Sequence, residues 1–141
     1  MSKITVHTDG GARGNPGPAA IGVVIDGFSV GKITTGEYIG ETTNNVAEYR
    51  ALIFALKHIK ELGEKADSII CYADSELMVK QLNGEYKVKD TNIRALFLEL
   101  QALKSELGMP ISFEHVPRTK NAHADEIVNE ILDKKLGKTA I

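Results

Sequence analysis

Four acidic residues stand out because each lies beside apolar residues rather than in a charged stretch. Asp9 closes the alternating segment 3–9, and Asp74 closes the apolar segment 67–74. Glu48 (in NNVAEYRAL) and Asp125 (in KNAHADEIVNE) lie near the starts of two segments with helical spacing. A carboxylate in such surroundings is unfavourable unless it is paired or binds a metal ion. The four residues are therefore candidates for a shared cation-binding site that could support acid–base or metal-assisted chemistry.

Each acidic residue taken alone also has a purely structural interpretation. Asp9 is typical of a turn, and Asp74 of a helix cap. Asp125 is favoured in a first helical turn by the helix dipole, and Glu48 fits an N-terminal capping interaction. The strand order favours the shared site, because Asp9 and Asp74 would lie side by side at the carboxyl end of a sheet if their strands are parallel neighbours. Ligands bind at that edge in open α/β sheets.

Electrostatic repulsion indicates what would accompany such a cluster. Two unit charges about 5 Å apart repel by roughly 3 kcal/mol at an effective dielectric constant of 20. Four carboxylates form six such pairs, so the total is comparable with the stability of a small domain. Protons relieve this repulsion in part and divalent cations relieve it better. Because the ligands are all oxygen atoms, Mg²⁺ or Mn²⁺ is favoured over zinc.

The acidic residue Asp9 is followed by a stretch with few functional side chains, GGARGNPGPAA at 10–20. Glycine allows another molecule to approach the main chain closely, and it also permits tight bends. The stretch is therefore either a structural bend or a surface against which a large ligand packs beside the carboxylate.

The spacing of apolar residues predicts the elements that position these side chains. Three strands at 3–9, 19–26 and 29–39 form a meander, with Asp26–Gly27 as a hairpin turn pair. A helix begins at Thr43 or Asn44 and ends at Gly63. There follow a strand at 67–74, helices at 75–84 and 91–108, a strand at 111–117 and a helix at 121–137. The order predicts an α/β fold with a five-stranded mixed sheet, three strands antiparallel and two parallel, and helices on both faces.

Composition sets the broad class of the protein. The chain has 141 residues, of which 43% are hydrophobic and 26% charged, as in a globular protein with one domain; we expect a single domain over 1–141 with its core at about 3–135. No apolar run reaches the roughly 20 residues of a membrane span, and no secretory signal opens the chain, so we expect a cytoplasmic protein. The single cysteine, Cys71, excludes an internal disulfide. The net charge of −2 argues against a nucleic-acid partner unless bound cations offset the carboxylates.

Four motifs in this order resemble type 1 ribonuclease H: TDGGARGNPGPAA, TTNNVAEYRAL, YADSELMVKQLNGEYKVK and VPRTKNAHADEIVNE. The similarity runs from about Ile4 to about Leu132. It implies a ribonuclease H-like fold and an endonuclease that hydrolyses the RNA strand of RNA–DNA hybrids, leaving 3′-hydroxyl and 5′-phosphate ends. It also implies two Mg²⁺ ions, with Mn²⁺ as a substitute, held by Asp9, Glu48, Asp74 and Asp125.

The resemblance further implies the residues that contact the hybrid. The Gly10–Gly14 backbone, which includes Gly11, would face the ribose side together with Asn15, and Asn44 and Asn45 would face the minor groove. Thr43 would anchor a phosphate of the DNA strand with help from Arg13. Two alternatives stay open at this point: helix capping by Asn44 and Asn45, and a solvated surface charge for Arg13.

The chain departs from the family pattern in two places. The loop before the last helix lacks the histidine found in many members, and Arg118 or His123 could act there as an auxiliary residue. The basic protrusion of many bacterial members is also absent, leaving Lys87 and Lys89. We expect a monomer with modest substrate affinity that depends on Mg²⁺. The alternatives are a nuclease of the same fold that cleaves double-stranded RNA, and a hybrid-binding module without catalysis.

Overall fold

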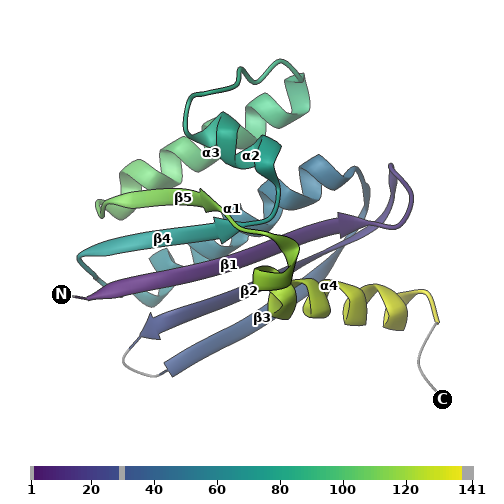
Figure 1. Ribbon diagram of the computed structural model, residues 1–141, viewed down its shortest axis with the longest axis horizontal. Coiled ribbons are helices and arrows are strands. Elements are labelled where there is room, and N and C mark those ends of the chain that lie inside the picture. The colour runs from purple at the N-terminus through teal and green to yellow at the C-terminus, as the bar shows by residue number, and fades with distance from the viewer. Residues whose placement is uncertain (1, 29–30, 138–141) are drawn as a thin grey trace.

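Five strands form one mixed sheet in the computed structural model, which describes residues 2–28 and 31–137. The strands are β1 (Lys3–Ala12), β2 (Gly17–Phe28), β3 (Gly31–Thr42), β4 (Ser68–Ala73) and β5 (Ile111–His115). Their order in the sheet is β3-β2-β1-β4-β5 (Figure 1). The first three strands are antiparallel, and β4 and β5 continue the sheet in parallel with β1. The predicted five-stranded mixed sheet is confirmed.

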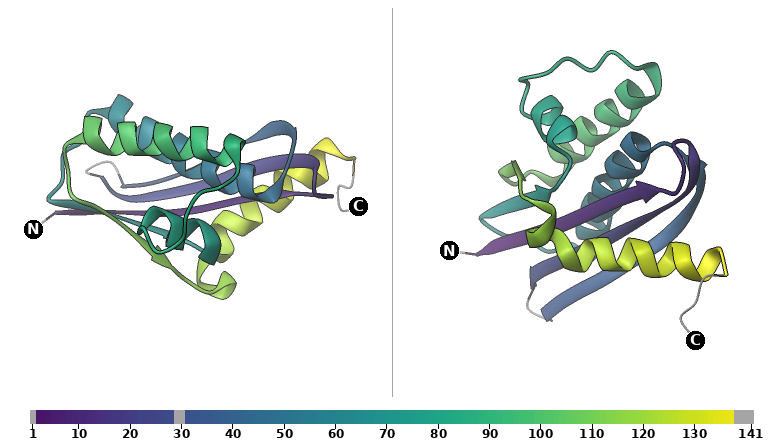
Figure 2. Two further views of the ribbon diagram at one scale, coloured as in Figure 1. Left: turned by 90° about the horizontal axis from the view of Figure 1, so that it is seen from above. Right: turned by 45° about the vertical axis from the view of Figure 1, so that its right-hand side comes forward.

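Helices cover both faces of this sheet, as predicted. The helices are α1 (Asn44–Leu62), α2 (Glu76–Leu82), α3 (Thr91–Leu107) and α4 (Ala122–Lys135), with a 3₁₀ turn at Arg118–Asn121. Figure 2 shows α1 and α3 on one face and α4 on the other. The larger apolar core lies beneath α1 and α3 and includes Ile4 and Val6 of β1, whereas a smaller cluster joins α4 to β2. No helix within residues 2–28 and 31–137 has the length and apolar character needed to cross a membrane.

The caps of α1 follow directly from its sequence. The Thr43 hydroxyl accepts a hydrogen bond from the Val46 backbone N–H, so Thr43 is the N-cap and Asn44 is already helical. Gly63 ends the helix in the left-handed conformation, with φ of 68°. Thr43 therefore fixes where α1 begins and Gly63 where it ends, which places Glu48 five residues after the N-cap.

Several predicted strand boundaries are wrong, including the end of the third strand, which continues past residue 39 to Thr42. The first strand does not end at Asp9 but continues to Ala12, because the backbones of residues 10–12 pair with those of residues 19–21 in β2. The second strand does not turn at Asp26–Gly27: both residues lie inside β2, at an irregularity of the pairing between Ile25 and Phe28. Gly27 takes a φ of 108° there, and the Asp26 carboxylate accepts its N–H. The predicted start of the third strand at 29–30 falls outside the described residues.

Candidate active site

The parallel register of β1 and β4 places Asp9 beside Asp74. Thr8 pairs with Ala73, so the next residues of the two strands, Asp9 and Asp74, lie together where β4 ends. Asp9 is only 6% exposed, and its backbone pairs with Gly22 of β2. The predicted neighbourhood of these two carboxylates at the end of the parallel strands is confirmed.

Glu48 reaches the same point because α1 packs unusually closely on β1. A Cβ atom at Gly10 would overlap the backbone of Ala47 and Glu48, so only glycine allows this approach. The Gly10 backbone N–H then donates a hydrogen bond to Glu48 Oε1. The glycine after Asp9 therefore has a structural role: it brings the helix-borne carboxylate to the strand-borne ones.

Three carboxylates form a tight group in the described part of the chain. One oxygen atom from each of Asp9, Glu48 and Asp74 lies within 4.8 Å of the others. Asp125, in the first turn of α4, lines the same cleft of about 500 Å³ but is not part of this tight group. The Asp125 Oδ2 atom instead accepts a hydrogen bond of 3.3 Å from Asn129 Nδ2. The four predicted residues therefore meet in one cleft, with Asp125 on its α4 wall.

Burial and mutual repulsion make the ionised carboxylates unfavourable here. Burial, followed by repulsion from Asp74, raises the pKa of Asp9 to about 7. Burial, followed by repulsion from Asp9, raises the pKa of Glu48 well above its usual value. The Asp74 Oδ2 atom is buried and accepts no hydrogen bond, although Arg118 Nε lies 4.0 Å away. A set of closely spaced carboxylate oxygens, one of them lacking a hydrogen-bond donor, fits a hard divalent cation.

The residues predicted to contact substrate divide between two neighbouring pockets. Gly10, Gly11, Arg13, Asn44 and Asn45 line the acidic cleft. Asn15 and Thr43 line a second pocket of about 290 Å³, which shares Asn45 with the first. Gly14 is exposed in the turn between β1 and β2, with φ of 93°.

The predicted contact residues also hold the start of α1 against the β1–β2 turn. The Asn44 Oδ1 atom accepts the Ala12 backbone N–H at 2.8 Å, and the Asn44 backbone N–H donates to Asn15 Oδ1 at 3.0 Å. The Thr43 hydroxyl acts as the helix cap. These bonds fix the start of α1, where Asn44 and Asn45 line the acidic cleft and Thr43 and Asn45 line the neighbouring pocket.

The two auxiliary candidates lie in different places. Arg118 lines the acidic cleft, and its side chain is 80% exposed. His123 is exposed at the start of α4 and lines a separate pocket of about 150 Å³ with His7 and Lys32. Of the two, only Arg118 faces the carboxylates. Asn129 was not expected from the sequence; its spacing of four residues from Asp125 on a helix is the signal that could have revealed it.

Comparisons with known proteins agree with this geometry. The family described as "Reverse transcriptase-like" matches residues 7–131. The "Bifunctional protein Rv2228c" of Mycobacterium tuberculosis is 40% identical over 133 residues, 93% of this chain but 36% of that protein. A "Ribonuclease H" of Verminephrobacter eiseniae is 30% identical over 156 residues, 100% of this chain and 97% of that protein. A crystal structure of LC11-RNase H1 in complex with an RNA/DNA hybrid has a TM-score of 0.88 and 47% identity, covering 94% of this chain and 99% of the other.

A mixed sheet whose neighbouring parallel strands present carboxylates beside a helix-borne glutamate defines a ribonuclease H-like domain. The four motifs, the full-length relative and the solved structures agree, and this chain belongs to the type 1 ribonuclease H family. The chain spans only about a third of the mycobacterial relative, which has further sequence that this chain does not match.

Proposed function

We propose that the protein is a metal-dependent endonuclease that hydrolyses the RNA strand of RNA–DNA hybrids and leaves 3′-hydroxyl and 5′-phosphate ends. The observation that carries the proposal is the group of Asp9, Glu48 and Asp74 oxygens within 4.8 Å, with Asp125 on the wall of the same cleft. The solved LC11-RNase H1 complex with an RNA/DNA hybrid supports the substrate class.

The proposed cofactor is a pair of Mg²⁺ ions, with Mn²⁺ as a substitute, held by Asp9, Glu48, Asp74 and Asp125. Two such ions would supply an activated water on one side of the phosphorus and charge stabilisation for the leaving oxygen on the other. Because the pKa of Asp9 is raised to about 7, this carboxyl group is protonated in a fraction of the molecules near neutral pH when no cation is bound. Cation binding therefore displaces a proton, which is why we expect metal binding and activity to increase as the pH rises through about 7.

The other residues of the cleft would bind and orient the hybrid. Gly11 and Ala12 present the main chain of β1 with little side-chain bulk, so the wide and shallow minor groove with its 2′-hydroxyl groups can approach. Asn45 projects from the start of α1 into both neighbouring pockets. Arg118, exposed and 4.0 Å from Asp74, would contact a phosphate group of the substrate.

A cleavage assay with three labelled duplexes tests the proposal. RNA–DNA hybrid, double-stranded RNA and double-stranded DNA are each incubated with Mg²⁺ or with EDTA. We expect cleavage of the RNA strand of the hybrid with Mg²⁺ only. Cleavage of double-stranded RNA at least as fast as the hybrid would move the assignment to the alternative nuclease, and hybrid binding without cleavage would make the protein a binding module.

A further inference from the structure

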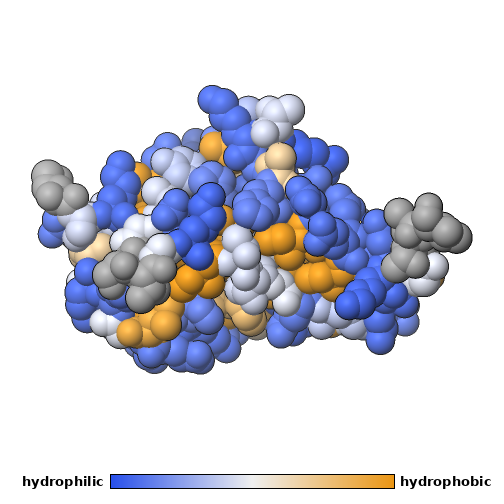
Figure 3. All heavy atoms as spheres, turned by 90° about the horizontal axis from the view of Figure 1, so that it is seen from below, coloured by the Kyte–Doolittle hydropathy of each residue, from blue (hydrophilic) through white to orange (hydrophobic). Residues whose placement is uncertain are grey.

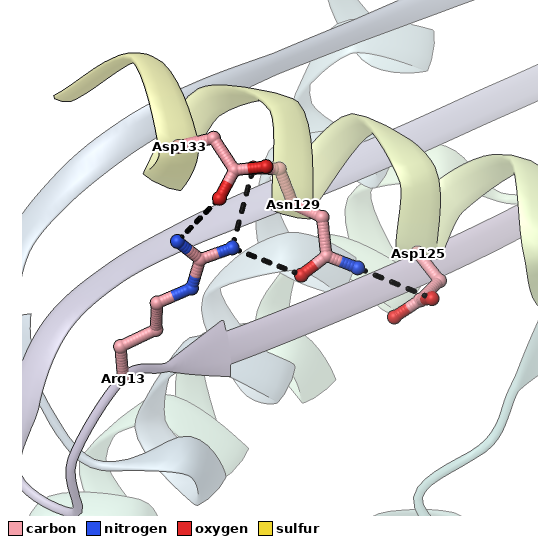
Figure 4. A network of polar contacts seen from close by, with 4 residues as sticks. All are labelled: Arg13, Asp125, Asn129 and Asp133. Atoms are coloured by element: carbon pink, nitrogen blue, oxygen red, sulfur yellow. Dashed lines mark hydrogen bonds and ion pairs between the residues drawn. The ribbon is translucent and has the colours of Figure 1, made fainter. Parts of the chain in front are cut away.

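The carboxylate of Asp125 is held by a neighbour on its own helix. Asn129 follows one helical turn after Asp125, and its Nδ2 atom donates a hydrogen bond of 3.3 Å to Asp125 Oδ2. Figure 4 shows the two side chains along the same face of α4, with the amide between Asp125 and Arg13. Asp125 lies outside the tight group of three carboxylates, and the hydrogen bond from Asn129 is a contact that can set its orientation.

Arg13, on the strand side of the cleft, contacts both Asn129 and Asp133 of α4. It follows β1, the strand that carries Asp9, and its Nη1 atom forms an ion pair of 2.6 Å with Asp133 Oδ1 on α4. Its Nη2 atom lies 3.4 Å from Asn129 Oδ1 and 3.5 Å from the Asn129 backbone oxygen. The guanidinium group therefore ties the end of β1 to the middle of α4 (Figure 4).

Chemistry fixes the direction of the Asn129 amide. Arginine is a donor only, so the amide must turn its oxygen to Arg13. The amide nitrogen then necessarily faces Asp125, which as a carboxylate accepts hydrogen bonds. Without Arg13, the amide could rotate and present its oxygen to Asp125, which would repel the carboxylate instead of holding it.

We propose that Asn129 is a positioning residue that holds the Asp125 carboxylate toward the other three carboxylates, and that Arg13, anchored on Asp133, fixes the orientation of Asn129. The inference rests on the proposed function, because it assigns these residues to the metal site of the nuclease. It also gives Arg13 a different role from the phosphate contact that the sequence predicts. Mutation of a residue that hydrogen-bonds to a metal ligand typically lowers metal affinity by about 10- to 100-fold. Asn129 is exposed and Asp133 is only partly buried, so a smaller effect is expected here.

Metal binding without nucleic acid tests this role. The measurement is the Mg²⁺ or Mn²⁺ concentration that gives half of the full rise in melting temperature of the intact protein. For Asn129→Ala and Arg13→Ala we expect this concentration to increase roughly three- to tenfold. Asn129→Gln, which keeps the amide, should show a smaller increase than Asn129→Ala. Glu130→Ala, at the next and exposed position of α4, is the matched control and should match the wild type.

A double variant tests whether Arg13 affects metal binding through Asn129 or independently of it. If Arg13 acts through Asn129, Arg13→Ala with Asn129→Ala should shift the metal midpoint no further than Asn129→Ala alone. The metal-free melting temperature should change by no more than a few degrees, because a partly exposed ion pair near the surface contributes little to stability.

Three results would overturn the inference. An unchanged midpoint for Asn129→Ala removes the positioning role of Asn129. Additive shifts in the double variant remove the link between Arg13 and Asn129. Weaker hybrid binding by Arg13→Ala, with an unchanged metal midpoint, would return Arg13 to the phosphate contact. A failure of the proposed function looks different, because the wild-type protein itself would then show neither a metal-dependent melting shift nor hydrolysis of the hybrid.

Discussion

Asp74 combines a proposed role as a metal ligand with a position that is unfavourable for folding. Its Oδ2 atom is buried without a hydrogen bond, and its charge raises the pKa of both Asp9 and Glu48. We predict that Asp74→Asn reduces hybrid hydrolysis by on the order of 10³-fold or more, since a ligand of the reacting metal is lost. The same substitution should raise the metal-free melting temperature at pH 8 by a few degrees, because it removes repulsion.

Gel assays and thermal melts of the same preparations check both effects of Asp74→Asn. Glu76→Gln is the matched control: Glu76 is an acidic residue two positions further along, with its side chain 62% exposed. It should leave hydrolysis and melting temperature close to those of the wild type. Near-normal hydrolysis by Asp74→Asn would contradict the metal assignment.

The raised pKa of Asp9 predicts how the stability of the metal-free protein depends on pH. The folded state has a pKa of about 7 at Asp9, against about 3.9 for an unfolded aspartate, so it binds more protons between these values. The contribution of Asp9 to the free energy of unfolding is therefore fully present below pH 4 and is lost as the pH rises to about 7. Thermal melts in EDTA at pH 5 and pH 8 should show a larger decrease for the wild type than for Asp9→Asn. An equal decrease for both proteins would rule out this titration, and Mg²⁺ should restore wild-type stability at pH 8.

The sequence predicts the helices and strands that have a periodic pattern of apolar side chains. It does not predict strand segments that are held by backbone pairing alone. The helices and the parallel strands follow from apolar spacing and caps such as Thr43 and Gly63. The extension of β1 from Asp9 to Ala12 could not be read in this way, because glycine and alanine carry no apolar pattern although their backbones pair normally. Asp26–Gly27 has the composition of a hairpin turn but lies within β2. Asn129 looks like any polar residue on a helix surface until Arg13 is placed beside it.

The close contact between α1 and β1 predicts a large effect of one methyl group. Gly10→Ala would place a Cβ inside the backbone of Ala47, so the helix must move away from the strand. We predict a loss of about 2–4 kcal/mol in the free energy of unfolding, typical of overpacking against a rigid neighbour. Gly11→Ala is the matched control, since its Cβ would lie at an ordinary 3.5 Å from a Val128 methyl group. Urea denaturation measures both variants, and equal stability of the two would contradict the close packing.

The distribution of charge over the whole molecule affects how strongly the protein can bind a nucleic acid, which is a polyanion. The net charge is −2, and the acidic cleft is lined by Asp9, Glu48, Asp74 and Asp125. Figure 3 shows that the surface beside β3 and α4 consists of hydrophilic residues with strips of apolar ones between them. The basic side chains lining the cleft, among the described residues, are Arg13 and Arg118. Hybrid binding without metal should therefore be weak, and bound cations must offset much of the acidic charge.

The two arginines that line the cleft differ in how their side chains are held. Arg118 is 80% exposed, whereas Arg13 is held by Asp133 at 2.6 Å. Each phosphate contact contributes about −0.7 to −0.9 to the slope of log binding constant against log salt concentration. In EDTA, where no cleavage occurs, Arg118→Ala should therefore make this slope shallower by about one, while Arg13→Ala leaves it unchanged. Fluorescence anisotropy with a labelled hybrid from 20 to 200 mM salt, roughly the range in which such contacts are screened, measures both slopes. A shallower slope for Arg13→Ala alone would show that the ion pair with Asp133 opens when nucleic acid binds.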